Sequence, residues 1–171
     1  MSVVLTKFKL TKNGVEAEYT EYEQAEGVNL PTEVTKKIPN QPKDELLAAF
    51  DNLIPHLMMM SAYVDETKVD NPNDLLELPL AKMFKVTGLV MKDSGVTLIG
   101  RRTLPNKKVL NLVPPFFLWE NPEGIDGYAF SFSFGSAVDL AATLAQEYLS
   151  GDRHNFGAQL SFDFDNPVPE E

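Results

Sequence analysis

The chain opens with two runs in which apolar and polar residues alternate. Residues 3–10 and 15–22 follow the period of two that places every second side chain on one face of a β-strand. Thr11-Lys12-Asn13-Gly14 separates the runs, and Asn-Gly between β-rich segments is a strong hairpin signal. The sequence therefore predicts an antiparallel hairpin. Residues 23–42 are polar and proline-containing, and predict a long connection with a short strand over 32–37.

A helical pattern follows over residues 43–61. Its apolar positions recur at the spacing of three and four that one helix face requires: Leu46, Leu47, Phe50, Ile54 and Leu57. Pro55 lacks a backbone N–H, so we expect the helix to kink or end there. Residues 64–81 are acidic and contain Asn71-Pro72-Asn73, which predicts a loop.

The second half of the chain predicts three more strands, at 84–91, 96–102 and 108–113. Aromatic residues then alternate with small ones, which predicts a strand with four rings on one face: Tyr128, Phe130, Phe132 and Phe134. A helix is expected over 137–149, with Ser136 as its N-cap and Gly151 just past its end.

These elements predict an α+β fold, a mostly antiparallel sheet of five or six strands with two helices and a C-terminal tail. Strands and helices do not alternate, which argues against a doubly wound parallel sheet. We expect residues 1–151 to form one globular domain and 152–171 an acidic tail. No internal repeat is visible in the sequence.

Composition narrows the chemistry. The chain has 171 residues, of which 43% are hydrophobic, enough for a single core. It has no cysteine and only two histidines, so we expect no disulfide, no metal site and no cofactor. No apolar run approaches the roughly 20 residues of a membrane span, and the first residues do not resemble a signal peptide. We therefore expect no membrane partner and a cytoplasmic location.

The net charge of −10 conceals a basic segment. Residues 80–112 carry Asp93 as their single acid, against seven basic side chains: Lys82, Lys85, Lys92, Arg101, Arg102, Lys107 and Lys108. Both flanking regions are acidic. This asymmetry either reflects chance segregation of surface charge or marks an anion-binding element in an acidic body.

Catalytic signatures are missing from the sequence. It contains no glycine-rich phosphate loop and no Gly-x-Ser-x-Gly elbow, and neither histidine has a recognisable serine context. We expect a protein that is not an enzyme. Paired carboxylates such as Glu16/Glu18 and Asp163/Asp165 leave a metal-dependent hydrolase as a remaining alternative.

The predicted hairpin at 96–112 is the first candidate site. Arg101, Arg102, Lys107 and Lys108 flank its turn, and such crowding of like charges is favourable when an anion neutralises it. Nucleic-acid phosphate is the natural ligand, with Lys85 as a further cation and Trp119 as an aromatic that could stack on bases. The alternative is an edge strand that its cations protect from aggregation.

The second candidate site lies in the tail, where Gln159-Leu160-Ser161-Phe162-Asp163-Phe164 resembles the Gln-Leu-x-Leu-x-Phe peptide that docks on the bacterial β sliding clamp. The resemblance implies that Gln159 enters a polar pocket, while Leu160, Phe162 and Phe164 fill an apolar groove. Phe162 replaces the usual leucine. The same residues also alternate as an ordinary edge strand would.

The chain as a whole resembles small uncharacterised proteins of phages and prophages. The resemblance rests on Tyr19-Thr20-Glu21, on residues 53–57, on the strand 95–100 and on a helix followed by a Gln-Leu terminus. It implies action inside a bacterial host cell. We expect a DNA-metabolism accessory that binds nucleic acid, single-stranded DNA first, and docks on the clamp. The alternative is an interaction protein that inhibits or sequesters a host factor or a nucleotide signal.

Overall fold

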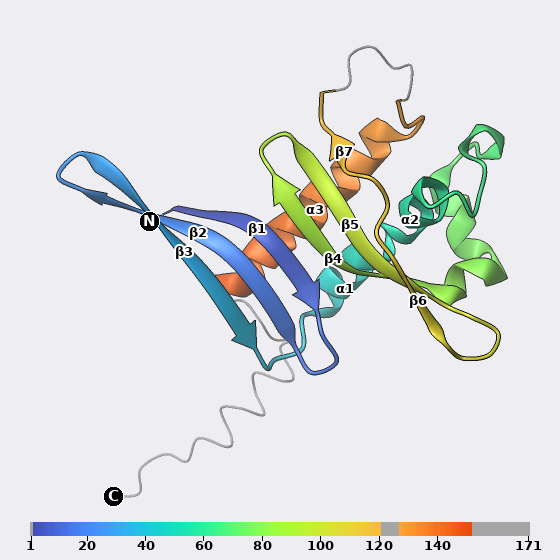
Figure 1. Cartoon of the computed structure of the whole chain (residues 1–171), viewed down its shortest axis with the longest axis horizontal. Helices are drawn as coiled ribbons and strands as arrows, with labels where there is room; N and C mark the ends of the chain where they lie inside the picture. The colour runs from blue at the N-terminus through green and yellow to red at the C-terminus, as the bar shows by residue number, and fades with distance from the viewer. Residues whose placement is uncertain (1, 121–126, 152–171) are drawn as a thin grey trace, which may run out of the picture.

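The computed structural model describes residues 2–120 and 127–151. Its strands are β1 Ser2–Leu10, β2 Val15–Ala25, β3 Val28–Ile38, β4 Phe84–Lys92, β5 Gly95–Thr103, β6 Val109–Leu112 and β7 Phe117–Leu118. Its α-helices are α1 Asp44–Asp51, α2 Ile54–Met60 and α3 Ser131–Leu149, and short 3-10 turns are η1 Glu66–Lys68, η2 Pro72–Glu77 and η3 Pro79–Met83 (Figure 1).

The strands form one antiparallel sheet in the order β3-β2-β1-β4-β5-β6, and β7 pairs with β5 beyond the end of β6. The helices cover one face of this sheet. Phe8 points toward them from β1, is fully buried, and contacts Phe50 of α1 and Tyr148 of α3. Its neighbours Lys7 and Lys9 point the other way, because side chains alternate along a strand. We call that second, uncovered side of the sheet the open face.

The α+β class predicted from the sequence is confirmed. Strands and turns at both predicted hairpins match within a few residues, and Pro55 marks the break between α1 and α2, where it occupies the first turn of α2. The described residues contain a seventh short strand and a third α-helix beyond the expected set. In these same residues no helix is long and apolar enough to cross a membrane. The predicted tail, 152–171, lies outside the described residues.

Two local predictions are wrong. Most of residues 23–42 are not a connection, because β2 and β3 continue outward as a long hairpin that turns at Glu26-Gly27, both at positive φ. The expected strand over 32–37 is confirmed as part of β3, and residues 39–43 form the connection to α1. The strand over the aromatic residues is also wrong, because α3 begins at Ser131 and the predicted cap Ser136 lies inside it. Helical geometry then separates the rings, since Phe134 is fully buried while Phe132 is 88% exposed.

The sheet consists of two similar halves that meet at a short seam. Only Lys7–Val90, Phe8–Leu89 and Lys9–Gly88 pair between β1 and β4. On either side of the seam, a three-stranded meander leads into a helix: β1-β2-β3 into α1, and β4-β5 with the broken strand β6–β7 into α3. The fold therefore contains a structural repeat that the sequence did not reveal.

Shared irregularities establish this repeat at the level of residues. In each first strand a threonine forms a β-bulge, Thr6 in β1 and Thr87 in β4. Each threonine donates its hydroxyl proton across to the second strand, Thr6 to the carbonyl of Glu18 at 2.9 Å and Thr87 to that of Ile99 at 3.3 Å. An offset of 81 in residue number relates Thr6 to Thr87 and Glu18 to Ile99. The same offset pairs Thr20 with Arg101.

A glycine closes each hairpin for the same steric reason. A Cβ atom at Gly14 would overlap the carbonyl oxygen of Ile38, and one at Gly95 would overlap that of Phe117. Both carbonyls belong to the third strand of their half, so no side chain fits at either turn. The glycine of the Asn-Gly signal is thus required for packing in the native sheet as well as for the turn.

Candidate nucleic-acid interface

A depression of about 480 Å³ opens where β1 and β4 diverge below the seam. The connection from β3 to α1 borders it, and the β1–β2 turn and the β5–β6 hairpin project at the same end of the sheet (Figure 1). We call it the cationic hollow. Its lining residues are Leu10, Thr11, Lys12, Gln41, Lys85, Thr87 and Arg101.

Three cations from three different elements line this hollow. Lys85 on β4 and Arg101 on β5 are direct cross-strand partners, and Lys12 comes from the β1–β2 turn. All three side chains are exposed. Like charges directly opposite each other on a sheet are destabilising, so the Lys85–Arg101 pair destabilises the protein when no anion is bound.

No acid is among the residues that line the hollow. In the described ranges, none of its three cations forms an ion pair, whereas lysines elsewhere on the open face do: Lys7 lies 3.8 Å from Glu18, and Lys37 lies 3.6 Å from Glu16. Asp51, near the end of α1, interacts electrostatically with Lys85: burial raises the pKa of its carboxyl, and the Lys85 charge lowers it.

Neutral polar groups complete the lining. Gln41 reaches across from the β3–α1 connection and donates its side-chain amide to the carbonyl of Lys12 at 2.9 Å, which fixes the turn that carries this lysine. The hydroxyls of Thr11 and Thr87 also border the hollow. Cations, hydroxyls and an amide are the groups that contact phosphate oxygens in nucleic-acid complexes.

Because of the repeat, a second hollow lies between equivalent positions of β1 and β4, but its lining carries a different charge. At the other end of the seam, a depression of about 480 Å³ is lined by Val4, Leu5, Thr6, Thr20, Tyr22, Met91, Lys92, Asp93, Ala142 and Gln146. We call it the counterpart hollow. Here Val4, Thr20 and Asp93 occupy the positions that Lys85, Arg101 and Lys12 hold in the cationic hollow. The fold therefore does not require cations at these positions.

The structure does not keep the four predicted hairpin cations together. Arg101 lies on the open face, whereas Arg102 lies on the helix-covered face, where its guanidinium stacks over Tyr63 at 4.7 Å and Phe84 at 5.7 Å from the ring centres. Lys107 and Lys108 are exposed in the turn between β5 and β6, at the same end of the sheet as the hollow. Of the predicted cations, only Lys85 and Arg101 line the cationic hollow, and Lys12, which was not predicted, lines it with them.

The predicted stacking residue Trp119 is not near these cations. Its backbone N–H bonds to Ser94 at the β4–β5 turn, and its ring packs against Phe117 with ring centres 5.8 Å apart. Leu118, the residue before it, pairs with Gly95 at the start of β5, six residues from Arg101. Six residues of strand span about 20 Å, so Trp119 and the cationic hollow lie at opposite ends of the sheet.

Sequence reasoning missed Lys12, Thr87 and Gln41 as members of the site. Lys12 lies in a turn, Thr87 in a strand and Gln41 in a linker. Each residue type is ordinary in such a segment, so the sequence pattern gives no reason to assign it to a binding site. Their proximity depends on the pairing of β1 with β4, which joins residues far apart in the chain, and no local pattern reports that pairing. Gln159, Leu160, Phe162 and Phe164 lie outside the described residues.

The buried histidine belongs to a separate aromatic cluster. His56 is 2% exposed, and its Nδ1 lies 2.7 Å from the hydroxyl of Tyr128. Burial lowers the pKa of His56 to about 4, while burial and the Glu66 carboxylate raise the pKa of Tyr128. Both groups are therefore neutral near pH 7, and the hydrogen bond joins α2 to the segment that leads into α3.

No family model, curated protein or solved structure matches this chain.

Proposed function

We propose that this protein binds nucleic acid through phosphate groups held in the cationic hollow, and that it acts by binding, without catalysis. One observation carries the proposal: Lys12, Lys85 and Arg101 converge on one hollow with no acid in its lining, while the counterpart hollow on the same backbone lacks this charge. A cross-strand pair of like charges that the fold does not need is best explained by a bound anion.

Lys107 and Lys108 extend the surface in this proposal. They lie exposed in the β5–β6 turn at the same end of the sheet, so a phosphate backbone seated in the hollow can continue toward them. Single-stranded DNA is the first ligand to test. Affinity through backbone phosphates carries little sequence preference and depends steeply on salt.

The tail supplies the second part of the proposal. We propose that Gln159, Leu160, Phe162 and Phe164 dock on the bacterial β sliding clamp, which would bring the nucleic-acid-binding body to replicating DNA in a phage-infected cell. Binding of the full chain to purified clamp, beside a Gln159→Ala/Phe164→Ala variant, tests this part alone. Clamp binding that is equally strong in the variant, or absent in the wild type, rejects it.

A second candidate ligand is a free nucleotide. A hollow of about 480 Å³ falls within the range of small-molecule sites. The protein would then sequester a nucleotide signal in the host. Titration with mononucleotides and with oligonucleotides separates the two ligands, because a polymer ligand gains affinity with length and a single-nucleotide ligand does not.

The decisive experiment measures fluorescence anisotropy of labelled single-stranded DNA with two charge reversals. Arg101→Glu lies in the cationic hollow, and Lys92→Glu lies in the counterpart hollow and changes the formal net charge by the same amount. We expect Arg101→Glu to weaken binding by at least about tenfold, the scale of one lost charge-assisted contact. We expect little change for Lys92→Glu. Equal effects, or none, contradict the proposed site.

A further inference from the structure

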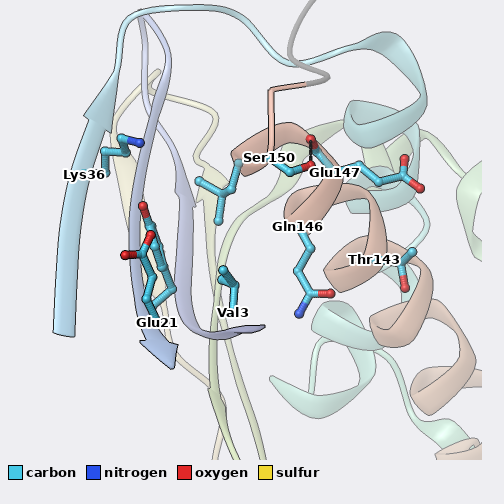
Figure 2. A pocket seen from close by; sticks show the side chains of 9 residues that line it. Val3, Glu21, Lys36, Thr143, Gln146, Glu147 and Ser150 are labelled. Carbon is cyan, nitrogen blue, oxygen red and sulfur yellow. Dashed lines mark hydrogen bonds between the residues drawn. The ribbon is translucent and has the colours of Figure 1, made fainter. Parts of the chain in front are cut away.

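A larger cleft, which shares Gln146 with the counterpart hollow, lies on the helix-covered face. It has a volume of about 530 Å³ and opens between the β1-β2-β3 meander and the last turns of α3 (Figure 2). We call it the α3 cleft. Its lining residues are Val3, Tyr19, Glu21, Lys36, Thr143, Gln146, Glu147, Leu149 and Ser150.

The α3 cleft leaves apolar surface uncovered on the side of the sheet that is otherwise packed. Val3 points into it from β1 and is 37% exposed, while Tyr19 and Leu149 are buried beside it. Figure 2 shows Lys36 and Glu21 on the strand side and Gln146 on the helix side. An apolar floor with a polar border suits a segment of polypeptide that presents apolar side chains.

The structural repeat shows what covers the equivalent surface in the other half. The offset that relates Thr6 to Thr87 places Phe84 and Gly100 at the positions of Val3 and Tyr19. There Leu57 of α2 packs directly on Gly100, and Tyr63 packs on Phe84 with ring centres 5.0 Å apart. Phe84 is only 4% exposed as a result, against 37% for Val3.

Chain order indicates the matching occupant. The covering residues 54–64 directly follow α1, the helix that ends the first meander unit. The helix that ends the second unit is α3, which at 19 residues is longer than the 8-residue α1, and its last residue Leu149 and its C-cap Ser150 themselves line the cleft. The residues that follow α3 therefore leave it at the surface that lacks a cover.

We propose that residues 152–171 of the same chain occupy the α3 cleft, as residues 54–64 occupy its equivalent. This segment contains apolar side chains for the floor, among them Phe156, Leu160 and Phe162. The contact is independent of the cationic hollow. It competes with the proposed clamp docking, because Leu160 and Phe162 cannot fill the cleft and a partner's groove together. The cleft would thus hold the docking segment until a partner displaces it.

Paramagnetic labelling of the full chain tests this proposal. The chain has no cysteine, so one introduced cysteine accepts one nitroxide label. Lys36→Cys places the label in the cleft, and Lys108→Cys places it in the exposed β5–β6 turn, at the edge of the sheet opposite β3. We expect the Lys36→Cys label to reduce the amide signals of residues 152–171 several-fold, and the Lys108→Cys label, five strands away across the sheet, to leave them nearly unchanged.

A second variant and a mixing experiment complete the test. Val3→Glu places a charge on the apolar floor at a partly exposed position, and we expect it to restore the signals of 152–171 next to the Lys36→Cys label while the fold, followed by thermal unfolding, persists. Equal signal loss from both labels contradicts the proposal. Signal loss in an unlabelled chain mixed with labelled chains shows a second copy in the cleft, which also overturns it.

Discussion

Arg101 and Arg102 are neighbours in the chain and lie on opposite faces of the sheet. Arg101 opposes Lys85 on the open face without an ion pair within the described residues. Arg102 stacks over Tyr63 and packs beside Phe84 on the covered face. Adjacent arginines therefore have different physical roles, one electrostatic toward solvent and one structural, and substitutions should separate them.

Arg101→Thr installs the residue that stands at the equivalent position, Thr20. We expect it to weaken binding to single-stranded DNA and to raise the free energy of unfolding by a few tenths of a kcal/mol, because a cross-strand repulsion disappears. Arg102→Ala should do the reverse and lower the free energy of unfolding by about 1 kcal/mol through the lost stacking, with DNA affinity unchanged. Urea unfolding and anisotropy measure both, and the reverse assignment would disprove these roles.

Salt dependence reports the number of phosphates that the protein contacts. The three cations in the hollow contribute about −2 to the slope of the logarithm of the DNA association constant against that of salt concentration, since each single-strand phosphate contributes about −0.7, and contacts of Lys107 and Lys108 make the slope steeper. Lys85→Gln removes about one phosphate contact, so the slope should move toward zero by about 0.7. Binding that is unaffected by salt would exclude phosphate recognition.

Two glycines should respond to alanine in opposite directions. Gly95→Ala forces a Cβ into the carbonyl oxygen of Phe117, and we expect a loss of about 1–3 kcal/mol in the free energy of unfolding. Gly135→Ala lies in α3, where the nearest atom to the new Cβ is in Trp119 at an ordinary 3.9 Å, so alanine should stabilise the fold by about 0.5–1 kcal/mol. Urea titration of both variants provides the comparison.

The buried histidine predicts a loss of stability in acid. The pKa of His56 is lowered from 6.5 to about 4, so the unfolded chain takes up a proton at this side chain before the folded one does. Above about pH 6.5 the histidine is neutral in both states and costs no stability; as the pH falls from 6.5 to 4, the free energy of unfolding decreases by about 3 kcal/mol in total. His56→Asn does not titrate and should remove this part of the pH dependence.

Chemical unfolding of both proteins at pH 7.5 and pH 4.5 measures that difference. The comparison with His56→Asn isolates the histidine, because the carboxylates of the two proteins are the same. An unchanged difference in stability between the two pH values would show that His56 is not buried in its neutral form.

Local sequence patterns correctly predicted the strands in which apolar and polar side chains alternate and whose turns contain characteristic turn residues such as Asn-Gly. The first hairpin, with its Asn13-Gly14 turn, and the strands near 84–102 are of this kind. The aromatic segment misled because Tyr128, Phe130, Phe132 and Phe134 alternate as a strand would, while the helix that follows extends back to Ser131. Packing of Phe134 in the core, against His56 and Phe117, outweighs the local preference.

The sequence by itself determined the fold class, the basic character of residues 80–112 and the presence of Lys85 and Arg101 in the candidate site. Only the tertiary structure decided which cations share a face, because strand parity separates Arg101 from Arg102 and the three-pair seam between β1 and β4 brings Lys12 to the hollow. The same seam creates two equivalent hollows and reveals the repeat. Such contacts join residues distant in the chain, and their pairing depends on the free energy of the whole sheet.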